Sequence, residues 1–204
     1  MPRLLEYHGL TEITGAPGTG RTAIAIEESK TCPTIYITTK ALCTSRYHGS
    51  SHEQMDRIVI KHVSTTSQLL MFVMNCIEQL IVERGIELVI IDSLDHLLAS
   101  EERGGSGCRS VFAIMNRLKR MNQKYLVDVL AVTCHYGNWV VENFCIENPV
   151  LGMQWAYIVN TKYMCIKNHD GRTLKLVKSP IHDPHDAVFE VHASSVIVIE
   201  SRAC

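Results

Sequence analysis

The glycine-rich stretch "GAPGTGRT" at residues 15–22 constrains this chain more than any other feature. Its spacing is that of a phosphate-binding loop, G-x-x-x-x-G-K-[ST], except that Arg21 occupies the lysine position. Its three glycines let backbone N–H groups turn inward around phosphate oxygens, and the loop opens onto the N-terminus of a helical segment. The pattern predicts an ATP-binding loop made of Gly15, Ala16, Pro17, Gly18, Thr19, Gly20, Arg21 and Thr22.

Two oxygen-bearing residues are predicted to hold Mg²⁺ beside this loop. The Thr22 hydroxyl is placed to bind the ion directly. Asp92 follows four apolar residues, 88–91, which put it at the carboxyl end of a buried strand, where open α/β sheets build their sites. We expect Asp92 to contact the ion through water. The alternatives are a glycine-rich turn without a ligand and an acid that only caps the next helix.

The order of apolar runs predicts an α/β fold with a mostly parallel twisted sheet flanked by helices, in a single domain over 1–204. A strand is expected to lead into the loop, and the compact runs "TIYIT", "IVIKHV", "ELVIID" and "VDVLAVT" are expected to be buried strands. One helix is expected between Thr65 and Gly85, with Thr65 and Gln68 as a capping box. A second is expected from about Val111 to Lys124, and it should bury Val111, Ile114, Met115, Leu118 and Met121.

The last third of the chain changes character. The segments "YIVNTKYMCIK", "RTLKLVK", "AVFEV" and "SVIVI" are predicted to be short strands joined by turns. One of these turns, "HDPHD", contains the metal-binding residue types His182, Asp183, His185 and Asp186. It also contains a proline, and we favour a structural turn over a metal site.

The net charge and the pattern of cysteines indicate which partners and which cellular compartment suit this chain. The net charge is −1 with neutral histidines, so no global field draws the chain to nucleic acid. Eight cysteines without a C-x-x-C pair favour reduced thiols in the cytosol or nucleus, and no apolar run approaches the roughly 20 residues that span a bilayer. A local basic run remains, and it is either a DNA-contacting patch or a solvated helix face: Arg103, Arg109, Arg117, Lys119, Arg120 and Lys124.

Taken in order, several segments resemble the RecA-type recombinases, in particular the recombinase-paralog branch of eukaryotic homologous recombination. "TEITGAPGTGRT" is similar to the family's Walker A strand and loop, and "LVIIDSL" to its Walker B strand. "RLKRMNQKYLVDVLAVTCH" resembles the helix and strand that follow, and "RTLKLVKSPIHDPHDAVFEVHASSVI" the C-terminal strands, with Ala187 and Phe189 in an A-x-F segment. The resemblance implies a RecA-like P-loop NTPase core with a C-terminal strand-rich extension.

The chain also departs from that family. Fourteen residues precede Gly15, so we expect the ATPase core without the family's N-terminal DNA-binding domain or its Phe-x-x-Ala linker, which docks on a neighbour. Lys40, in "YITTKA", takes the place of the family's catalytic glutamate, and His135 takes the place of the glutamine that senses the γ-phosphate. We therefore expect ATP with Mg²⁺ to bind, and weak or no ATPase activity.

The resemblance implies a nuclear DNA-repair protein that acts with a second paralog on a recombinase filament. The DNA-contacting loops would fall at about 100–109, with Arg103 and Arg109, and at 136–152, where binding would rely on stacking by Trp139 or Phe144. Single-stranded DNA binding by the chain alone is expected to be weak. The alternatives are a small P-loop kinase or an active ATPase, and a scaffold that has lost nucleotide binding; a kinase is disfavoured by the strand-rich C-terminal third.

Overall fold

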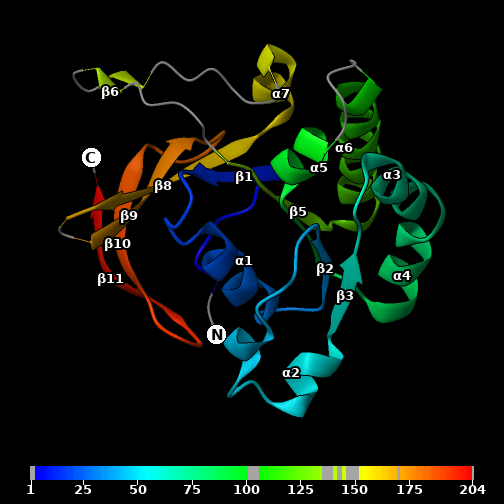
Figure 1. The fold of residues 1–204 in the computed structure, drawn as a ribbon, viewed down its shortest axis with the longest axis horizontal. Helices are drawn as coiled ribbons and strands as arrows, with labels where there is room; N and C mark the ends of the chain where they lie inside the picture. Colours follow the sequence, from blue (N-terminus) through cyan, green and yellow to red (C-terminus); the bar gives the residue numbers. More distant parts are fainter. Residues whose placement is uncertain are drawn as a thin grey trace.

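The computed structural model describes residues 3–100, 106–134, 140–141, 144–145, 152–169 and 171–203. Within them lies one long mixed sheet with the strand order β11-β10-β9-β8-β1-β5-β4-β2-β3 (Figure 1). Its strands are β1 (Leu10–Gly15), β2 (Thr34–Thr38), β3 (Ile58–His62), β4 (Leu88–Asp92), β5 (Asp128–Val132), β8 (Thr161–Asn168), β9 (Gly171–Lys178), β10 (His185–Val191) and β11 (Val196–Ala203). Strands β6 (Val140–Val141) and β7 (Phe144–Cys145) form a separate short hairpin.

The helices are α1 (Arg21–Ser29), α2 (His52–Asp56), α3 (Thr66–Asn75), α4 (Ile77–Arg84), α5 (Leu94–Ser100), α6 (Ser106–Tyr125) and α7 (Gly152–Ile158), with a 3-10 turn η1 (Thr44–Tyr47). Strands β3, β2, β4, β5, β1 and β8 pair in parallel, whereas β8 to β11 pair antiparallel. The α/β class and the mostly parallel sheet flanked by helices are confirmed. So is the strand-rich C-terminal extension, because β9, β10 and β11 continue the sheet beyond β8.

The central strands are buried on both faces, which explains why they are almost continuously apolar. In β2, Ile35 and Ile37 pack into the core that also receives α3 and α6, while Tyr36 points into the core that receives α1. Successive side chains of a strand point to opposite faces, so one apolar run supplies two cores. Figure 1 shows the same arrangement, with α1 on one side of the sheet and α3 to α6 on the other.

Strand β3 corrects the prediction that "IVIKHV" is buried. It lies at the edge of the sheet and pairs only with β2 among the described residues. Ile60 is 43% exposed, and Lys61 and His62 are exposed. An apolar β-branched run does not distinguish a central strand from an edge strand. The consequence is an unpaired row of backbone groups on the surface.

The predicted helix between Thr65 and Gly85 is interrupted. Helices α3 and α4 meet at Cys76, whose φ of −119° departs from helical geometry. The Thr65 hydroxyl caps α3 by accepting the Gln68 N–H at 3.1 Å, as predicted, but the Gln68 side chain accepts from the Ser64 N–H rather than closing a box on Thr65. Gly85 ends α4 in the left-handed region (φ 59°), as predicted.

Helix α6 begins at Ser106, earlier than predicted, and buries all five apolar residues assigned to its inner face. Its basic face is not wholly free. The Glu78 carboxylate of α4 pairs with Arg117 Nη2 at 2.6 Å and with Lys124 Nζ at 2.9 Å. Two of the six cations in the predicted basic run therefore contribute to packing between α6 and α4. Within the described part of the chain, no helix is both long and apolar enough to cross a bilayer.

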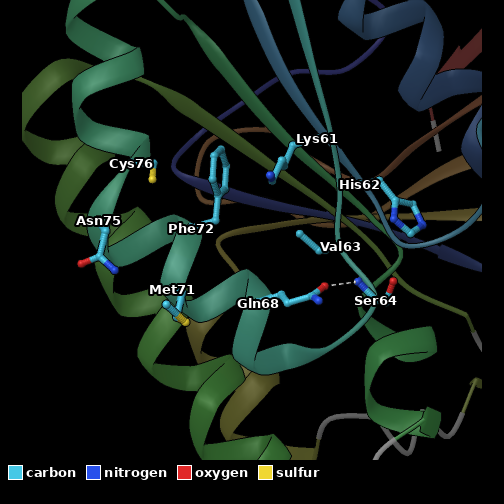
Figure 2. A pocket seen from close by; sticks show the side chains of 9 residues that line it. All are labelled: Lys61, His62, Val63, Ser64, Gln68, Met71, Phe72, Asn75 and Cys76. Atoms are coloured by element: carbon cyan, nitrogen blue, oxygen red, sulfur yellow. Dashed lines mark hydrogen bonds between the residues drawn. The ribbon is translucent and has the colours of Figure 1, made fainter.

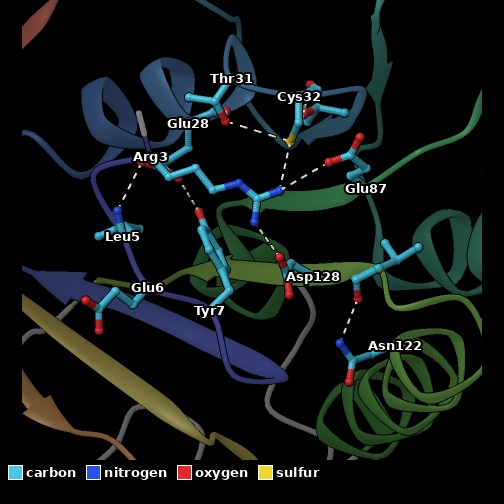
Figure 3. A network of polar contacts seen from close by, with 12 residues as sticks. Arg3, Leu5, Glu6, Tyr7, Glu28, Thr31, Cys32, Glu87, Asn122 and Asp128 are labelled. Carbon is cyan, nitrogen blue, oxygen red and sulfur yellow. Dashed lines mark hydrogen bonds and ion pairs between the residues drawn. The ribbon is translucent and has the colours of Figure 1, made fainter. Parts of the chain in front are cut away.

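The segment before β1 is held in the fold by polar contacts (Figure 3). The Glu28 carboxylate of α1 accepts the Leu4 and Leu5 N–H groups and, at 2.9 Å, the Tyr7 hydroxyl. Arg3 pairs with Asp128 at the start of β5 and lies 3.7 Å from Glu87. These contacts hold the segment against α1 and the amino end of β5.

Candidate nucleotide site

The glycine-rich loop connects β1 to α1 at the carboxyl end of the parallel strands. Gly15 is packed so tightly on β8 that a Cβ there would lie 2.4 Å from the Cys165 carbonyl oxygen. At the other end Gly20 is the N-cap of α1 with φ 105°, and no side chain caps that helix. The first N–H groups of α1 therefore lack a side-chain acceptor, which is the arrangement that receives phosphate oxygens.

The residues between these glycines form a tight turn at the surface. Thr19 is buried, and its Oγ1 donates to the Ala16 carbonyl at 2.8 Å. Ala16, Pro17 and Gly18 are exposed. The loop thus has fixed ends and an accessible tip, as a ligand-binding loop requires.

The two residues predicted to hold Mg²⁺ lie together. Thr22 Oγ1 donates to Asp92 Oδ1 at 3.3 Å, and the buried Tyr36 hydroxyl donates to Asp92 Oδ2 at 2.7 Å. Burial raises the pKa of Asp92, against the opposing effects of the Tyr36 and Thr22 hydrogen bonds and the Arg21 charge. Two oxygen ligands beside an open pocket suit Mg²⁺, which usually takes one or two protein oxygens and keeps several waters.

Arg21 is directed across the site rather than along the loop. Its Nη1 donates to the Thr133 carbonyl just after β5, and its Nη2 lies 3.4 Å from Cys134 Sγ. The guanidinium is thereby held at the carboxyl edge of the sheet, where it lines the pockets on both sides of the loop. A lysine ammonium is a compact point charge and lacks the planar fork through which Arg21 reaches both residues after β5.

One of these pockets has a volume of about 240 Å³ and is markedly basic. Three arginines line it together with Gly18 and Gly20: Arg21, Arg46 from η1 and Arg172 from β9. Arg46 Nη1 donates to the His192 carbonyl at 3.1 Å, and the buried Arg172 Nε has no hydrogen-bond partner in the described structure. Arg46 and Arg172 were not predicted from the sequence, because no motif marks them and only the folded sheet brings them to the loop.

The other pocket, of about 120 Å³, contains the Thr22–Asp92 pair. Lys40, predicted from the resemblance to replace a catalytic glutamate, lines the same pocket from the loop after β2. Asp95 lines it as well, 6% exposed, with its Oδ1 accepting the Cys134 N–H at 3.0 Å. Asp95 was missed too, although its position three residues after Asp92 was a usable signal.

The remaining predicted residues are separated from this site or lie outside the described residues. Arg103 and His135 are outside them, as is most of the predicted loop 136–152. Arg109 is exposed on α6 and does not line either pocket beside the loop. A scan of the chain against protein-family models finds no match, and a search of curated proteins finds none either.

Proposed function

We propose that this chain is a recombinase-paralog mediator of homologous recombination and DNA repair. It binds ATP with Mg²⁺ and acts in the nucleus with a second paralog to stabilise or remodel recombinase filaments on single-stranded DNA. The observation that carries the nucleotide part is the Thr22–Asp92 hydrogen bond of 3.3 Å beside the glycine-rich loop, with a pocket on each side. The parallel sheet with its antiparallel extension is compatible with a RecA-like core.

The charges around the loop match a nucleoside triphosphate. Arg21, Arg46 and Arg172 bring three cations to a pocket that also contains the uncapped N-terminus of α1. Backbone N–H groups and arginines are the groups that bind phosphate oxygens most strongly. When bound, Mg²⁺ would neutralise phosphate charge, and Thr22 and Asp92 are the residues that would hold it.

Hydrolysis is expected to be slow because Lys40 stands where the family resemblance expects a glutamate that activates water. A water molecule that attacks the γ-phosphate must be oriented and relieved of a proton, and the cationic Lys40 does not accept one. Lys40 instead supplies a fourth positive charge near the terminal phosphate. The ATP-bound form of the chain is therefore expected to be long-lived.

Asp95 supports the competing function, an active ATPase. It is the second carboxylate in the pocket, although the Cys134 N–H occupies one of its oxygens. The steady-state rate of ATP hydrolysis by the purified chain distinguishes an active ATPase from a mediator that only binds ATP. Substantial hydrolysis that Asp95→Asn abolishes, with nucleotide affinity unchanged, would favour the ATPase; background turnover in both proteins supports the mediator.

A groove at the β3 edge supports partner binding (Figure 2). It has a volume of about 520 Å³ and lies between β3 and α3, lined among others by Lys61, Phe72 and Met71, which is 65% exposed. Exposed edge strands accept an extended segment as an added strand, and a neighbouring apolar groove accepts one of its side chains. We propose that the paralog or recombinase contributes such a segment here.

Co-purification from cells, followed by mass spectrometry, tests the mediator function. The chain is expected to bring down a recombinase or a recombinase paralog, and Met71→Glu in the groove should abolish this association. Val82→Glu is the matched control, because Val82 is 61% exposed on α4 and lies outside the groove. A monodisperse monomer without either partner would refute the mediator function.

A further inference from the structure

Glu6, His8 and His182 form a cluster on the surface, away from the nucleotide site. One ligand atom from each residue can be chosen so that all three lie within 4.8 Å of one another. His182 Nε2 is 2.9 Å from Glu6 Oε2, and the two imidazole rings have centroids 5.5 Å apart. Two histidines and a glutamate form a ligand set found in zinc proteins. From this cluster we infer a zinc-binding site that links the segment before β1 to the turn between β9 and β10.

The backbone positions two of the three ligands before any ion binds. The Glu6 N–H donates to the Tyr163 hydroxyl of β8 at 3.0 Å, and the His182 N–H donates to Ser179 Oγ at 3.1 Å. Tyr7, between Glu6 and His8, is held by Glu28 on the opposite side. Figure 3 shows Glu6 turned away from Tyr7 and Arg3. These contacts anchor the backbone of Glu6 and of His182 in the fold.

His8 has an unmet polar group that a metal ion would use. Its buried Nε2 has no hydrogen-bond partner in the described structure. The following residue, Gly9, has a φ of +82°, and a Cβ there would lie 2.8 Å from Asn160 Oδ1. The positive φ favours glycine at this position, next to His8.

Side-chain movements bring the ligand atoms to distances that zinc requires. Zinc bonds of about 2.0–2.2 Å place tetrahedral ligand atoms roughly 3.3 Å apart. The present separations, which reach no more than 4.8 Å, must therefore shorten by at most about 1.5 Å. Glu6 and His182 have half-exposed side chains, with 50% and 41% exposure, and are free to make this adjustment. Water would complete the coordination, since the described residues supply three ligands.

This site differs from the one suggested by the sequence motif "HDPHD". Of that motif only His182 joins the cluster, whereas His185 Nδ1 lies 3.3 Å from the Asp183 carbonyl oxygen. His185 therefore provides a matched control, because it belongs to the same turn and is not a ligand. The two other ligands come from the opposite end of the chain, which no sequence spacing reveals.

Zinc titration of the full chain, freed of metal with a chelator and kept reduced, tests the inference. We expect one zinc ion per chain in calorimetry, and a melting temperature that rises by about 5–10 °C at a hundredfold excess over Kd. Cobalt(II) substitution should give visible bands without a sulfur-to-cobalt charge-transfer band, because no thiolate is a ligand. His185→Ala should leave binding unchanged.

His8→Gln and His182→Gln should each weaken zinc binding at least tenfold, with the metal-free melting temperature unchanged to show that the variants fold. If either glutamine variant is too unstable to compare, Glu6→Gln, whose side chain is half exposed, replaces it and should show the same weakening. Unchanged affinity in these variants, an equal loss in His185→Ala, or a cobalt spectrum dominated by thiolate would overturn the site.

Discussion

The replacement of Gly15 by alanine tests the geometry of the glycine-rich loop most severely. Gly15 has a φ of +151°, and a Cβ would meet the Cys165 carbonyl oxygen at 2.4 Å and Thr19 Oγ1 at 3.0 Å. The first contact involves the backbone of β8, which pairs with β1 at this residue and cannot move independently. Unfavourable backbone geometry costs about 1–3 kcal/mol and overpacking about 1–3 kcal/mol more, so we expect a loss of about 2–6 kcal/mol in unfolding free energy.

Gly18→Ala is the matched control. Gly18 has a φ of +80°, but a Cβ there would meet nothing within 4 Å. Only the backbone conformation is penalised, at about 1–2 kcal/mol. Overpacking of about 1–3 kcal/mol applies to Gly15→Ala alone. Urea unfolding followed by circular dichroism should therefore separate the two variants by about 1–3 kcal/mol, with Gly15→Ala the less stable. Equal stability of the two variants would refute the tight packing of β1 on β8 at the loop.

Three further predictions concern single residues. Burial raises the pKa of Asp92, so the charged carboxylate opposes folding at pH values above that pKa, and the wild-type protein becomes more stable as the pH falls through it. In the absence of metal, Asp92→Asn should therefore have a higher melting temperature than the wild type at neutral pH. This difference in melting temperature should shrink on acidification. Constant advantage across a pH series of melting curves would contradict this. Tyr7→Phe removes the 2.9 Å hydrogen bond to the buried Glu28 carboxylate and should lower the free energy of unfolding, measured by chemical denaturation, by about 1.5–3 kcal/mol. An unchanged free energy of unfolding would mean that this hydrogen bond does not stabilise the fold. Arg109→Glu should weaken single-stranded DNA binding at low salt and reduce the slope of log affinity against log salt concentration by about 0.7, whereas Arg84→Glu, at an exposed control position, should change neither. If fluorescence anisotropy shows unchanged DNA binding in Arg109→Glu, the basic face of α6 is only solvated and does not contact DNA.

The sequence predicted those parts of the fold that local patterns determine. Helix α6 buries Val111, Ile114 and Met115 as its periodicity required, and Gly85 ends α4 as its position required. The parallel strands β1 to β5 were also located correctly, because such strands are largely apolar. The run "YIVNTKYMCIK" was predicted as a strand from Tyr157, which is wrong for its first residues: Tyr157 and Ile158 belong to α7, and β8 begins at Thr161. The break at Cys76 was not predicted, since neither glycine nor proline marks it.

What the sequence could not give was the lateral order of the strands. That order places β3 at an exposed edge, although its composition resembles that of the central strands. It also determines which distant side chains meet. Thr22 and Asp92 were paired from motif spacing alone, whereas Arg46, Arg172 and Asp95 were not identified, because their proximity to the loop depends on tertiary packing.

A Mg²⁺-dependent ATP titration of the purified chain or its complex, with steady-state ATPase measured on the same sample, tests the central claim most directly. We predict saturable binding that Asp92→Ala weakens at least tenfold, with turnover at background and a measurable rise in Lys40→Glu. Arg21→Lys should bind at least as tightly as the wild type, because lysine suits the loop. Robust hydrolysis by the wild-type chain that Asp92→Ala abolishes would contradict the account, and so would the absence of ATP binding even in Arg21→Lys.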